Sequence, residues 1–243
     1  MALLEREITE KESEIVKTAS AGEVGTLVSG VMHDLGNAVS VIMLSAQIAS
    51  EDETPDKKDV ERILKASRFA KGLISNAMSI VRGQEYVFEL SPIKEPLENA
   101  AALTEYTARK KSAVVELEVP DGLPQLRISK MHVERVFINC IINSLSFIPE
   151  KGVVRIKARV SEGGVTAEVT DNGPGFPEKL LKEGVKAFGT TRKDKGGTGL
   201  GLYVCDQILR RHGGTLKIDN APEGGARVSV FLPAPEPEKP VTA

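Results

Sequence analysis

The sequence predicts an α plus α/β fold: an antiparallel helical hairpin, then a two-layer α/β sandwich with a mixed sheet. Three observations support this class. Residues 1–83 show sustained helical periodicity with a single proline, Pro55. From residue 84 onward, short β-type runs mix with helical runs, and two glycine-rich stretches interrupt them. The proline-rich, charged end predicts a disordered tail. We therefore expect domains at 1–83 and 84–233 and a tail at 234–243.

The first domain is predicted from heptad spacing, which buries a narrow seam against partner helices. Apolar or small residues recur in steps of three and four at Val28, Val31, Leu35, Ala38, Ile42, Ser45 and Ala49, and again at Ile63, Ala66, Ala70, Leu73, Ala77 and Ile80. Between the two runs, Thr54 suits a helix cap and Pro55 suits a first helical turn. Two such helices cannot enclose a core, so we expect two hairpins to form a homodimeric four-helix bundle. The alternative is that the hairpin packs on its own second domain.

The second domain is predicted from short β-type runs bounded by turn residues. The expected strands are 86–90, 113–119, 126–129, 152–160, 165–171, 214–220 and 226–233, and the expected helices are 92–111, 130–148 and 198–211. These elements do not follow a strict βαβ alternation. We therefore expect the helices to cover one face of a mixed sheet.

Composition excludes several function classes. The chain has 243 residues, 41% of them hydrophobic and 27% charged, with a net charge of -2, an ordinary globular balance. This charge gives no electrostatic reason to bind nucleic acid. Tryptophan is absent and aromatic residues make up 4% of the chain, so a base-stacking surface is not expected.

Location is predicted from the same sequence. No apolar run approaches the roughly 20 residues that cross a bilayer, and the charged N-terminal segment does not resemble a signal peptide. Cys140 and Cys205 lie in apolar helical contexts without metal-ligand spacing, which indicates buried free thiols in a reducing compartment. We therefore expect a cytoplasmic protein without a membrane-spanning segment.

Three motifs in the second domain point to phosphate chemistry. DNGPGF at 171–176 follows a strand, so its aspartate is a fixed hydrogen-bond acceptor beside a tight turn. GGTGLGL at 196–202 opens a helix, where backbone N–H groups and the helix dipole favour an anion. Asn139 and Asn143 share one helix face and can offer oxygens to a hard cation such as Mg²⁺. Each motif alone also fits an ordinary turn or a solvated face.

In this order and spacing, the motifs resemble the ATP-binding domain of two-component sensor histidine kinases, a fold shared with gyrase B, Hsp90 and MutL-type ATPases. ERVFINCIINSL is similar to the family's N box, and DNGPGFPE and GGTGLGLYV are similar to its two glycine boxes. KAFGTTR is similar to its F-box region, and HGGTLKIDNAPEGGARVSVFLP to its closing strands. The resemblance covers about residues 85–233.

The resemblance implies ATP and Mg²⁺ as cofactors and assigns roles by position. Asp171 would bind the adenine amino group, Gly173 and Gly175 would shape the pocket wall, and Asn143 would bind Mg²⁺ with Asn139 close to the metal and phosphates. The phosphate-binding residues would be Thr190, Thr191, Arg192, Gly197, Thr198, Gly199, Leu200 and Gly201, beneath a mobile lid at 176–196. Ser146 departs from the basic residue of many relatives, which predicts weaker nucleotide affinity unless Lys193 or Lys195 compensates.

Asn139 also separates two reaction types within the resemblance. Gyrase-like ATPases carry a glutamate four residues before the metal asparagine, where it activates water. An asparagine at this position cannot accept a proton at neutral pH. The site is therefore expected to hold ATP without rapid hydrolysis and to leave the γ-phosphoryl group for another nucleophile.

That nucleophile is expected in the first domain. The stretch HDLGN at 33–37 resembles the histidine kinase phosphoacceptor box, and His33 falls opposite the heptad seam. A neutral imidazole can attack phosphorus while Asp34 holds its other nitrogen, and Asn37 lies one turn along on the same face. In the resembling family an amide at that position orients water for dephosphorylating the partner. His132 and His212 lack this spacing and are interpreted as structural.

The expected function is that of a homodimeric, ATP-dependent histidine kinase. It would phosphorylate His33 and pass the phosphoryl group to an aspartate of a separate response-regulator receiver domain, and dephosphorylation of that partner is also plausible. One alternative is a phosphotransfer scaffold with a non-catalytic nucleotide-like domain. Another is an ATPase or an anti-sigma-type serine kinase of the same superfamily.

Overall fold

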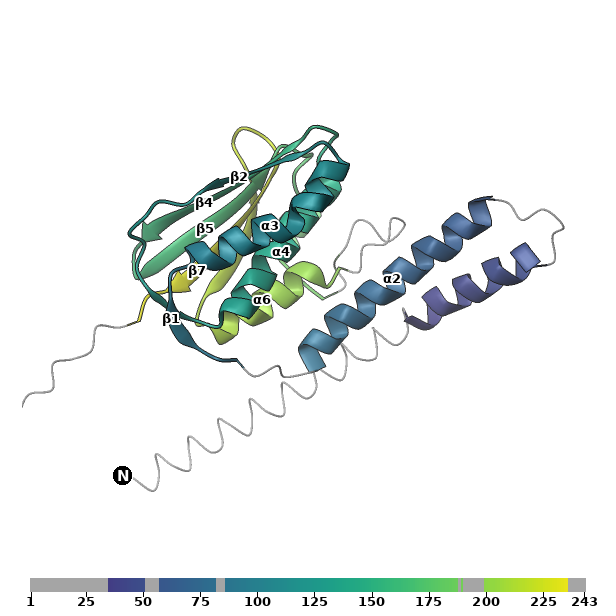
Figure 1. Cartoon of the computed structure of the whole chain (residues 1–243), viewed down its shortest axis with the longest axis horizontal. Helices are drawn as coiled ribbons and strands as arrows, with labels where there is room; N and C mark the ends of the chain where they lie inside the picture. The colour runs from purple at the N-terminus through teal and green to yellow at the C-terminus, as the bar shows by residue number, and fades with distance from the viewer. Residues whose placement is uncertain (1–34, 51–56, 82–85, 188, 190–198, 236–243) are drawn as a thin grey trace, which may run out of the picture. The chain divides into compact units, whose positions relative to one another are not determined.

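The computed structural model describes residues 35–50, 57–81, 86–187, 189 and 199–235. The chain passes from one compact unit into a second between Gln84 and Glu85 (Figure 1). Thr54, Pro55 and residues 236–243 of the predicted tail lie outside the described residues. Residues 234 and 235 of that tail are described, and the Ala234 N–H donates to the Gly163 carbonyl at 2.9 Å. Among the helices that the structure describes, none combines the length and apolar character that crossing a membrane requires.

The first unit contains a helix at 35–50 and helix α2, Lys57–Val81. Within residues 35–50, the side chains that are buried or half-buried are those of the predicted seam: Leu35, Ala38, Ile42, Ser45 and Ala49. On α2, the seam residues Ala66 and Ala70 are buried and Ile63 is half-buried. The heptad spacing therefore identifies the buried face of both helices.

The second unit is a two-layer α/β sandwich with a mixed sheet, as predicted. Its five-stranded sheet has the order β2-β4-β5-β7-β6, in which β2 and β4 are parallel and the other neighbours are antiparallel. The strands are β2 Val114–Glu118, β4 Val153–Ser161, β5 Gly164–Asp171, β6 Thr215–Asn220 and β7 Ala226–Pro233. A separate antiparallel pair joins β1 Glu89–Ser91 to β3 Leu126–Ile128.

Helices cover one face of this sheet, with α4 packed against both α3 and α6 (Figure 1). The helices of the second unit are α3 Lys94–Lys110, α4 Lys130–Phe147, α5 Glu178–Glu183 and α6 Gly201–Arg211. The central strands alternate as a half-buried sheet requires, so β5 buries Val165, Ala167 and Val169. The core therefore lies between the sheet and α4.

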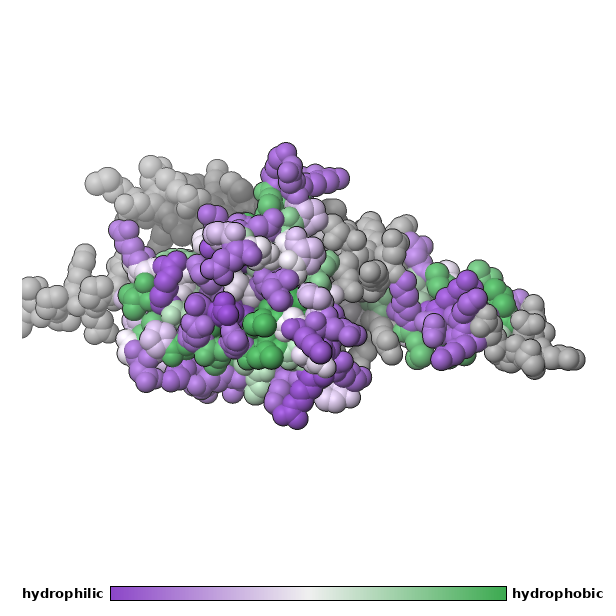
Figure 2. All heavy atoms as spheres, turned by 90° about the horizontal axis from the view of Figure 1, so that it is seen from above, coloured by the Kyte–Doolittle hydropathy of each residue, from purple (hydrophilic) through white to green (hydrophobic). Residues whose placement is uncertain are grey.

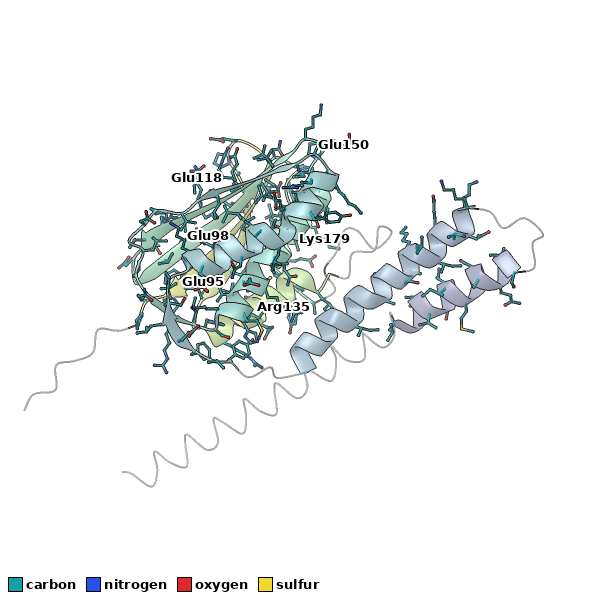
Figure 3. All side chains as sticks on the ribbon, viewed as in Figure 1. Glu95, Glu98, Glu118, Arg135, Glu150 and Lys179 are labelled. Carbon is teal, nitrogen blue, oxygen red and sulfur yellow. The ribbon has the colours of Figure 1, made fainter. Side chains whose placement is uncertain are left out.

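The other side chains of β4 form ion pairs with neighbouring strands. Arg155 Nε lies 2.9 Å from Glu116 Oε2, and Lys157 Nζ lies 2.8 Å from Glu118 Oε2. Figure 3 labels Glu118 on this part of the sheet. Exposed pairs of this kind contribute about 0–1 kcal/mol each, so they keep this face solvated more than they stabilise it.

Two predicted elements differ from the structure, and one helix was not predicted. Residues 86–88 are not a strand, because Tyr86 and Phe88 stack with histidine rings instead of pairing with a neighbouring strand. Helix α6 begins at Gly201 and not at 198, since Gly199 has a positive φ of 66° that a helix cannot contain. Helix α5 was not predicted, and it lies within the segment expected to form the lid.

Candidate functional site

Asp171 is the last residue of the core-facing row of β5. Burial alternates along the strand, so this carboxylate continues the row of Val165, Ala167 and Val169 and is only 7% exposed. Its Oδ1 accepts hydrogen bonds from the backbone N–H groups of Gly173 at 2.9 Å and Ala226 at 3.1 Å. Two backbone donors therefore hold this buried carboxylate in place, and both bind its Oδ1. Such hydrogen bonds offset the cost of burying a charge.

The turn after Asp171 packs against the end of α4. A Cβ added to Gly173 would lie 3.0 Å from Asp171 Oδ1 and 3.5 Å from the carbonyl oxygen of Phe147. The hairpin loop before β7 is equally close, since a Cβ on Gly225 would lie 1.7 Å from the Asp171 carbonyl oxygen. Only glycine, which lacks a Cβ, lets the backbone at residues 173 and 225 come this close to Asp171.

Asn220 holds the next part of the turn and was not singled out from the sequence. The N–H of Phe176 donates to Asn220 Oδ1 at 2.6 Å, and Asn220 Nδ2 donates to the Phe176 carbonyl at 3.1 Å. Gly175 has a φ of 79°, and a Cβ there would lie 2.7 Å from Asn220 Oδ1. The side-chain amide of Asn220 therefore connects the first glycine box to the end of β6.

Helix α4 places Asn139 and Asn143 one turn apart, as predicted, and both side chains are half-buried. Asn139 Nδ2 is a buried donor for which the described structure supplies no acceptor. Leaving such a donor unpaired costs about 1–3 kcal/mol, so the position favours a ligand that brings an acceptor. A phosphate oxygen is an acceptor of this kind.

The start of α6 meets the middle of α4. This start consists of Gly199, Leu200 and Gly201. Leu200 occupies the N-cap position, and its side chain forms no capping hydrogen bond. One turn later, the Cys205 thiol donates to the carbonyl of Val136 on α4 at 3.6 Å. The backbone N–H groups at such a helix end favour an anion, and α4 is the helix that carries the two asparagines.

The two cysteines are buried and free, as predicted. A hydrogen bond with Cys205, together with burial, raises the pKa of the Cys140 thiol well above its ordinary value. A protonated thiol is a poor nucleophile and a poor metal ligand, so both cysteines serve as packing for the α4–α6 contact.

The described residues contain no cluster of three His, Cys, Asp or Glu side chains that could hold a metal ion. A divalent cation would therefore depend on amide oxygens together with oxygens from a ligand. Mg²⁺ suits that arrangement, because it retains water and shares phosphate oxygens. The half-buried Asn143 carries one such amide oxygen.

Several predicted site residues lie outside the described residues: His33, Asp34, Thr190, Thr191, Arg192, Gly197 and Thr198. Asn37 is described and exposed on the helix at 35–50. Among the described residues, a Cβ on Gly36 would meet no atom within 4 Å. Ser146 donates its hydroxyl hydrogen to the Ile142 carbonyl at 2.7 Å, within its own helix.

The second unit matches a known protein family, and the chain is similar to known sensor kinases. Residues 128–236 match the family described as histidine kinase-, DNA gyrase B- and HSP90-like ATPases. The C4-dicarboxylate transport sensor protein DctB of Pseudomonas aeruginosa is 29% identical over 94% of this chain, and sporulation kinase C of Bacillus subtilis is 29% identical over 85%. Residues 128–236 therefore form an ATPase domain of the histidine kinase-, gyrase B- and HSP90-like kind. This assignment implies ATP binding by the second unit.

Solved structures show the same fold. The catalytic domain of histidine kinase ThkA is 26% identical, with a TM-score of 0.55 over 60% of this chain and 95% of that one. ThkA in complex with the response regulator TrrA gives a TM-score of 0.68 over 89% of this chain and 63% of that one, at 20% identity. The chain spans 39% of the length of DctB and 48% of the length of sporulation kinase C.

Proposed function

We propose that this chain is an ATP-dependent protein histidine kinase that phosphorylates His33 and transfers the phosphoryl group to an aspartate of a separate response regulator. In this proposal residues 1–83 form the dimerisation and phosphoacceptor domain, and residues 84–233 form the catalytic ATP-binding domain. The family assignment supports the reaction class, and the relationship to sensor kinases extends through most of both units.

The observation that carries the proposal is the unpaired Nδ2 of Asn139. An amide donor at this position favours a phosphate oxygen as its acceptor. It cannot take a proton from water, so it does not provide the base that an efficient ATPase needs. A site built in this way binds the triphosphate and preserves its γ-phosphoryl group for a protein nucleophile.

The remaining contacts to ATP are proposed from the described residues around Asp171 and from the resemblance of the sequence motifs. Asp171 uses Oδ1 for its two backbone donors, so its Oδ2 would accept the adenine amino group. Gly173 and Gly175 would form the wall beside the base. The residues assigned to the phosphates are Asn139, Thr190, Thr191, Arg192, Gly197, Thr198, Gly199, Leu200 and Gly201. Asn143 would bind Mg²⁺, which neutralises phosphate charge when it is bound.

The protein's part in the transfer is to present a neutral imidazole. One ring nitrogen of His33 attacks the γ-phosphorus, a P–N bond forms, and the bond from the γ-phosphorus to the bridging oxygen of ADP breaks. Asp34 would hold the proton on the other ring nitrogen and stabilise the positive charge that develops on the ring. The phosphoryl group then moves from nitrogen to the carboxylate of the response regulator.

Dimerisation through the helical hairpin is part of the proposal. Val41, Leu44 and Ile48 follow one another at helical spacing on the 35–50 helix, and 40–61% of each side chain is exposed. On α2, Val60 and Leu64 are 47% and 48% exposed. Figure 2 shows hydrophobic atoms at the surface of these helices. A second hairpin would cover this face and complete a four-helix bundle.

Asn37 supports a second activity at the same place. Asn37 is exposed on the 35–50 helix and follows His33 by four residues in the sequence, so its amide would orient water against a phosphorylated partner. We therefore include dephosphorylation of the response regulator in the proposal. The histidine kinase ThkA, which has a similar fold, has been solved in complex with the response regulator TrrA, an example of such a partner.

Incubation with γ-³²P-labelled ATP tests the proposal. The full chain should acquire a label that is lost in acid and retained in base, as phosphohistidine is, and His33→Gln should lose the label while ATP binding persists. Label retained by His33→Gln, label stable to acid, or steady phosphate release without label would contradict it. A chain that neither binds ATP nor acquires label would favour a phosphotransfer scaffold with a non-catalytic nucleotide-like domain.

A further inference from the structure

Two histidines of the second unit form a cluster with the aromatic residues that precede β1. The rings of Tyr86 and His132 stack with their centroids 3.7 Å apart and their planes within 13°. Phe88 packs on His212 with the centroids 4.9 Å apart, and Tyr86 meets His212 edge-on at 5.7 Å. Both histidines are buried. We call these four residues the aromatic–histidine cluster.

The hydrogen bonds of His212 allow one protonation state. Its Nδ1 lies 2.8 Å from the carbonyl of Ile208, which can only accept, so Nδ1 carries the proton. Its Nε2 lies 3.0 Å from the backbone nitrogen of Ser129, which donates, so Nε2 must keep its lone pair. A second proton on Nε2 would break this bond and set two donors against each other.

The bonds of His212 connect three segments that are distant in sequence. Ser129 is the N-cap residue of α4, the helix that carries Asn139 and Asn143. His212 is the C-cap residue of α6, the helix that begins at the second glycine box. Tyr86 and Phe88 belong to the segment through which the chain enters the second unit from α2. One neutral imidazole therefore fastens the entry segment to both helices of the candidate site.

The charges around the cluster oppose a further positive charge. The Arg211 guanidinium lies over the Tyr86 ring at 5.0 Å, and Arg135 on α4 (labelled in Figure 3) is the other cation acting on His132. Burial lowers the pKa of His212, partly offset by its hydrogen bond to the Ile208 carbonyl. Burial, then the neighbouring His212, Arg135 and Arg211, lower the pKa of His132.

We propose that the aromatic–histidine cluster is an acid-released latch. Uptake of one proton by His212 Nε2 breaks its bond to Ser129, adds a positive charge next to His132, on which Arg135 and Arg211 already act, and releases Tyr86 and Phe88 from α4 and α6. Lys130 Nζ stays within 2.7 Å of Glu95 and 3.4 Å of Glu89, and these pairs do not involve the imidazole. The release is therefore confined to Tyr86 and Phe88, which precede β1.

The direction of the pH effect follows from the lowered pKa of His212. Above the ordinary histidine pKa of about 6.5 the ring is neutral in the folded and unfolded chain, and the latch is closed. As the pH falls below that value, the unfolded chain binds the proton first, so the folded state loses stability. The loss stops once the pH is below the folded pKa, where the latch is open.

Nuclear magnetic resonance of the full chain with isotope-labelled histidine tests this inference, since the chain has only three histidines. At about pH 7.5 His212 should be the tautomer protonated at Nδ1, and the His132 ring protons should be shifted by the stacked Tyr86 ring. During titration His212 should take up its proton with a midpoint below about 6.5, and His132 should lose its ring-current shift in the same step.

Two variants sharpen the result. In His212→Gln the side-chain oxygen can still accept from Ser129 but cannot titrate, so the His132 shift should persist in acid. In His33→Gln, which changes the histidine outside the cluster, the wild-type titration should be unchanged. A tautomer protonated at Nε2, a His212 midpoint at or above about 6.5, or a His132 ring that stays stacked after His212 is protonated would overturn the proposal. If His212→Gln does not fold, the wild-type titration still decides.

Discussion

The side-chain amide of Asn220 pairs with the backbone of Phe176 through two hydrogen bonds, although 44 residues separate them in the sequence. This contact resembles one rung of a β-ladder in which an amide side chain replaces a strand. It fixes the first glycine box relative to β6 and hence relative to Asp171. The candidate site thus depends on a residue that touches none of the reacting groups.

Asn220→Ala removes both bonds and should lower the free energy of unfolding by about 1–3 kcal/mol. It should also weaken ATP binding, because the turn at Gly175 loses its support. Urea denaturation and calorimetry with ATP measure the two effects. Asn220→Asp keeps the acceptor for the Phe176 N–H and should lie between the alanine variant and the wild type. An alanine variant with wild-type stability would show that the pairing is not structural.

Asp171→Asn separates the structural role of this residue from its role in binding. The variant keeps an Oδ1 that can accept from Gly173 and Ala226, so the fold should survive. The second oxygen becomes an NH₂ group, a donor facing the donor amino group of adenine, and ATP affinity should fall by more than about tenfold. Asp171→Ala should lose both the affinity and about 1–3 kcal/mol of stability. Equal ATP affinity for Asp171→Asn and wild type would contradict the adenine assignment.

Asn139→Ala removes the unpaired buried donor. Without nucleotide, its stability should equal or exceed that of the wild type, because the wild type carries a donor without an acceptor at a cost of about 1–3 kcal/mol. The increase in melting temperature on adding Mg²⁺-ATP should be smaller than in the wild type, since the phosphate contact is gone. Ser146→Ala is the control, because the Ser146 hydroxyl bonds only within its own helix. A large loss of stability without ATP would count against this interpretation of Asn139.

Leu44→Glu places a charge in the exposed apolar stripe of the 35–50 helix, where the leucine is 61% exposed. If two hairpins meet at this stripe, burying the charge without a partner should dissociate the dimer at micromolar concentration. Sedimentation or light scattering measures the mass. Ser50→Glu, which adds the same charge at an exposed hydroxyl outside the stripe, should leave the dimer intact. A monomeric wild type would contradict the proposed dimer, and a dimeric Leu44→Glu variant would show that the interface lies elsewhere.

The strands and the helical seam could be predicted because burial itself imposes the pattern. The alternation of Val165, Ala167 and Val169 reflects a half-buried strand, and Ala38 and Ser45 fall on the heptad seam that the structure buries. Asp171, at the end of such a strand and before a glycine turn, was identified for the same reason. These signals are local, so a window of a few residues contains them.

The features that could not be predicted depend on distant partners. Asn220 ends an ordinary strand, and nothing near it in sequence indicates Phe176. The segment around Tyr86 has the aromatic composition of a strand, yet His132 and His212 offer its rings a better surface than a neighbouring strand would. Helix α5 has no buried residue, so it shows no hydrophobic period from which to predict it.

The parallel pairing of β2 with β4 has a consequence for how the protein acquires its activity. Val114 lies opposite Val153, and the chain between these strands contains β3 and the whole of α4. Parallel neighbours meet only after such a long connection closes, which is an entropically slow step in folding. Asn139 and Asn143 lie on α4, within that connection. A refolding chain should therefore regain its helical content early and its ability to bind nucleotide late.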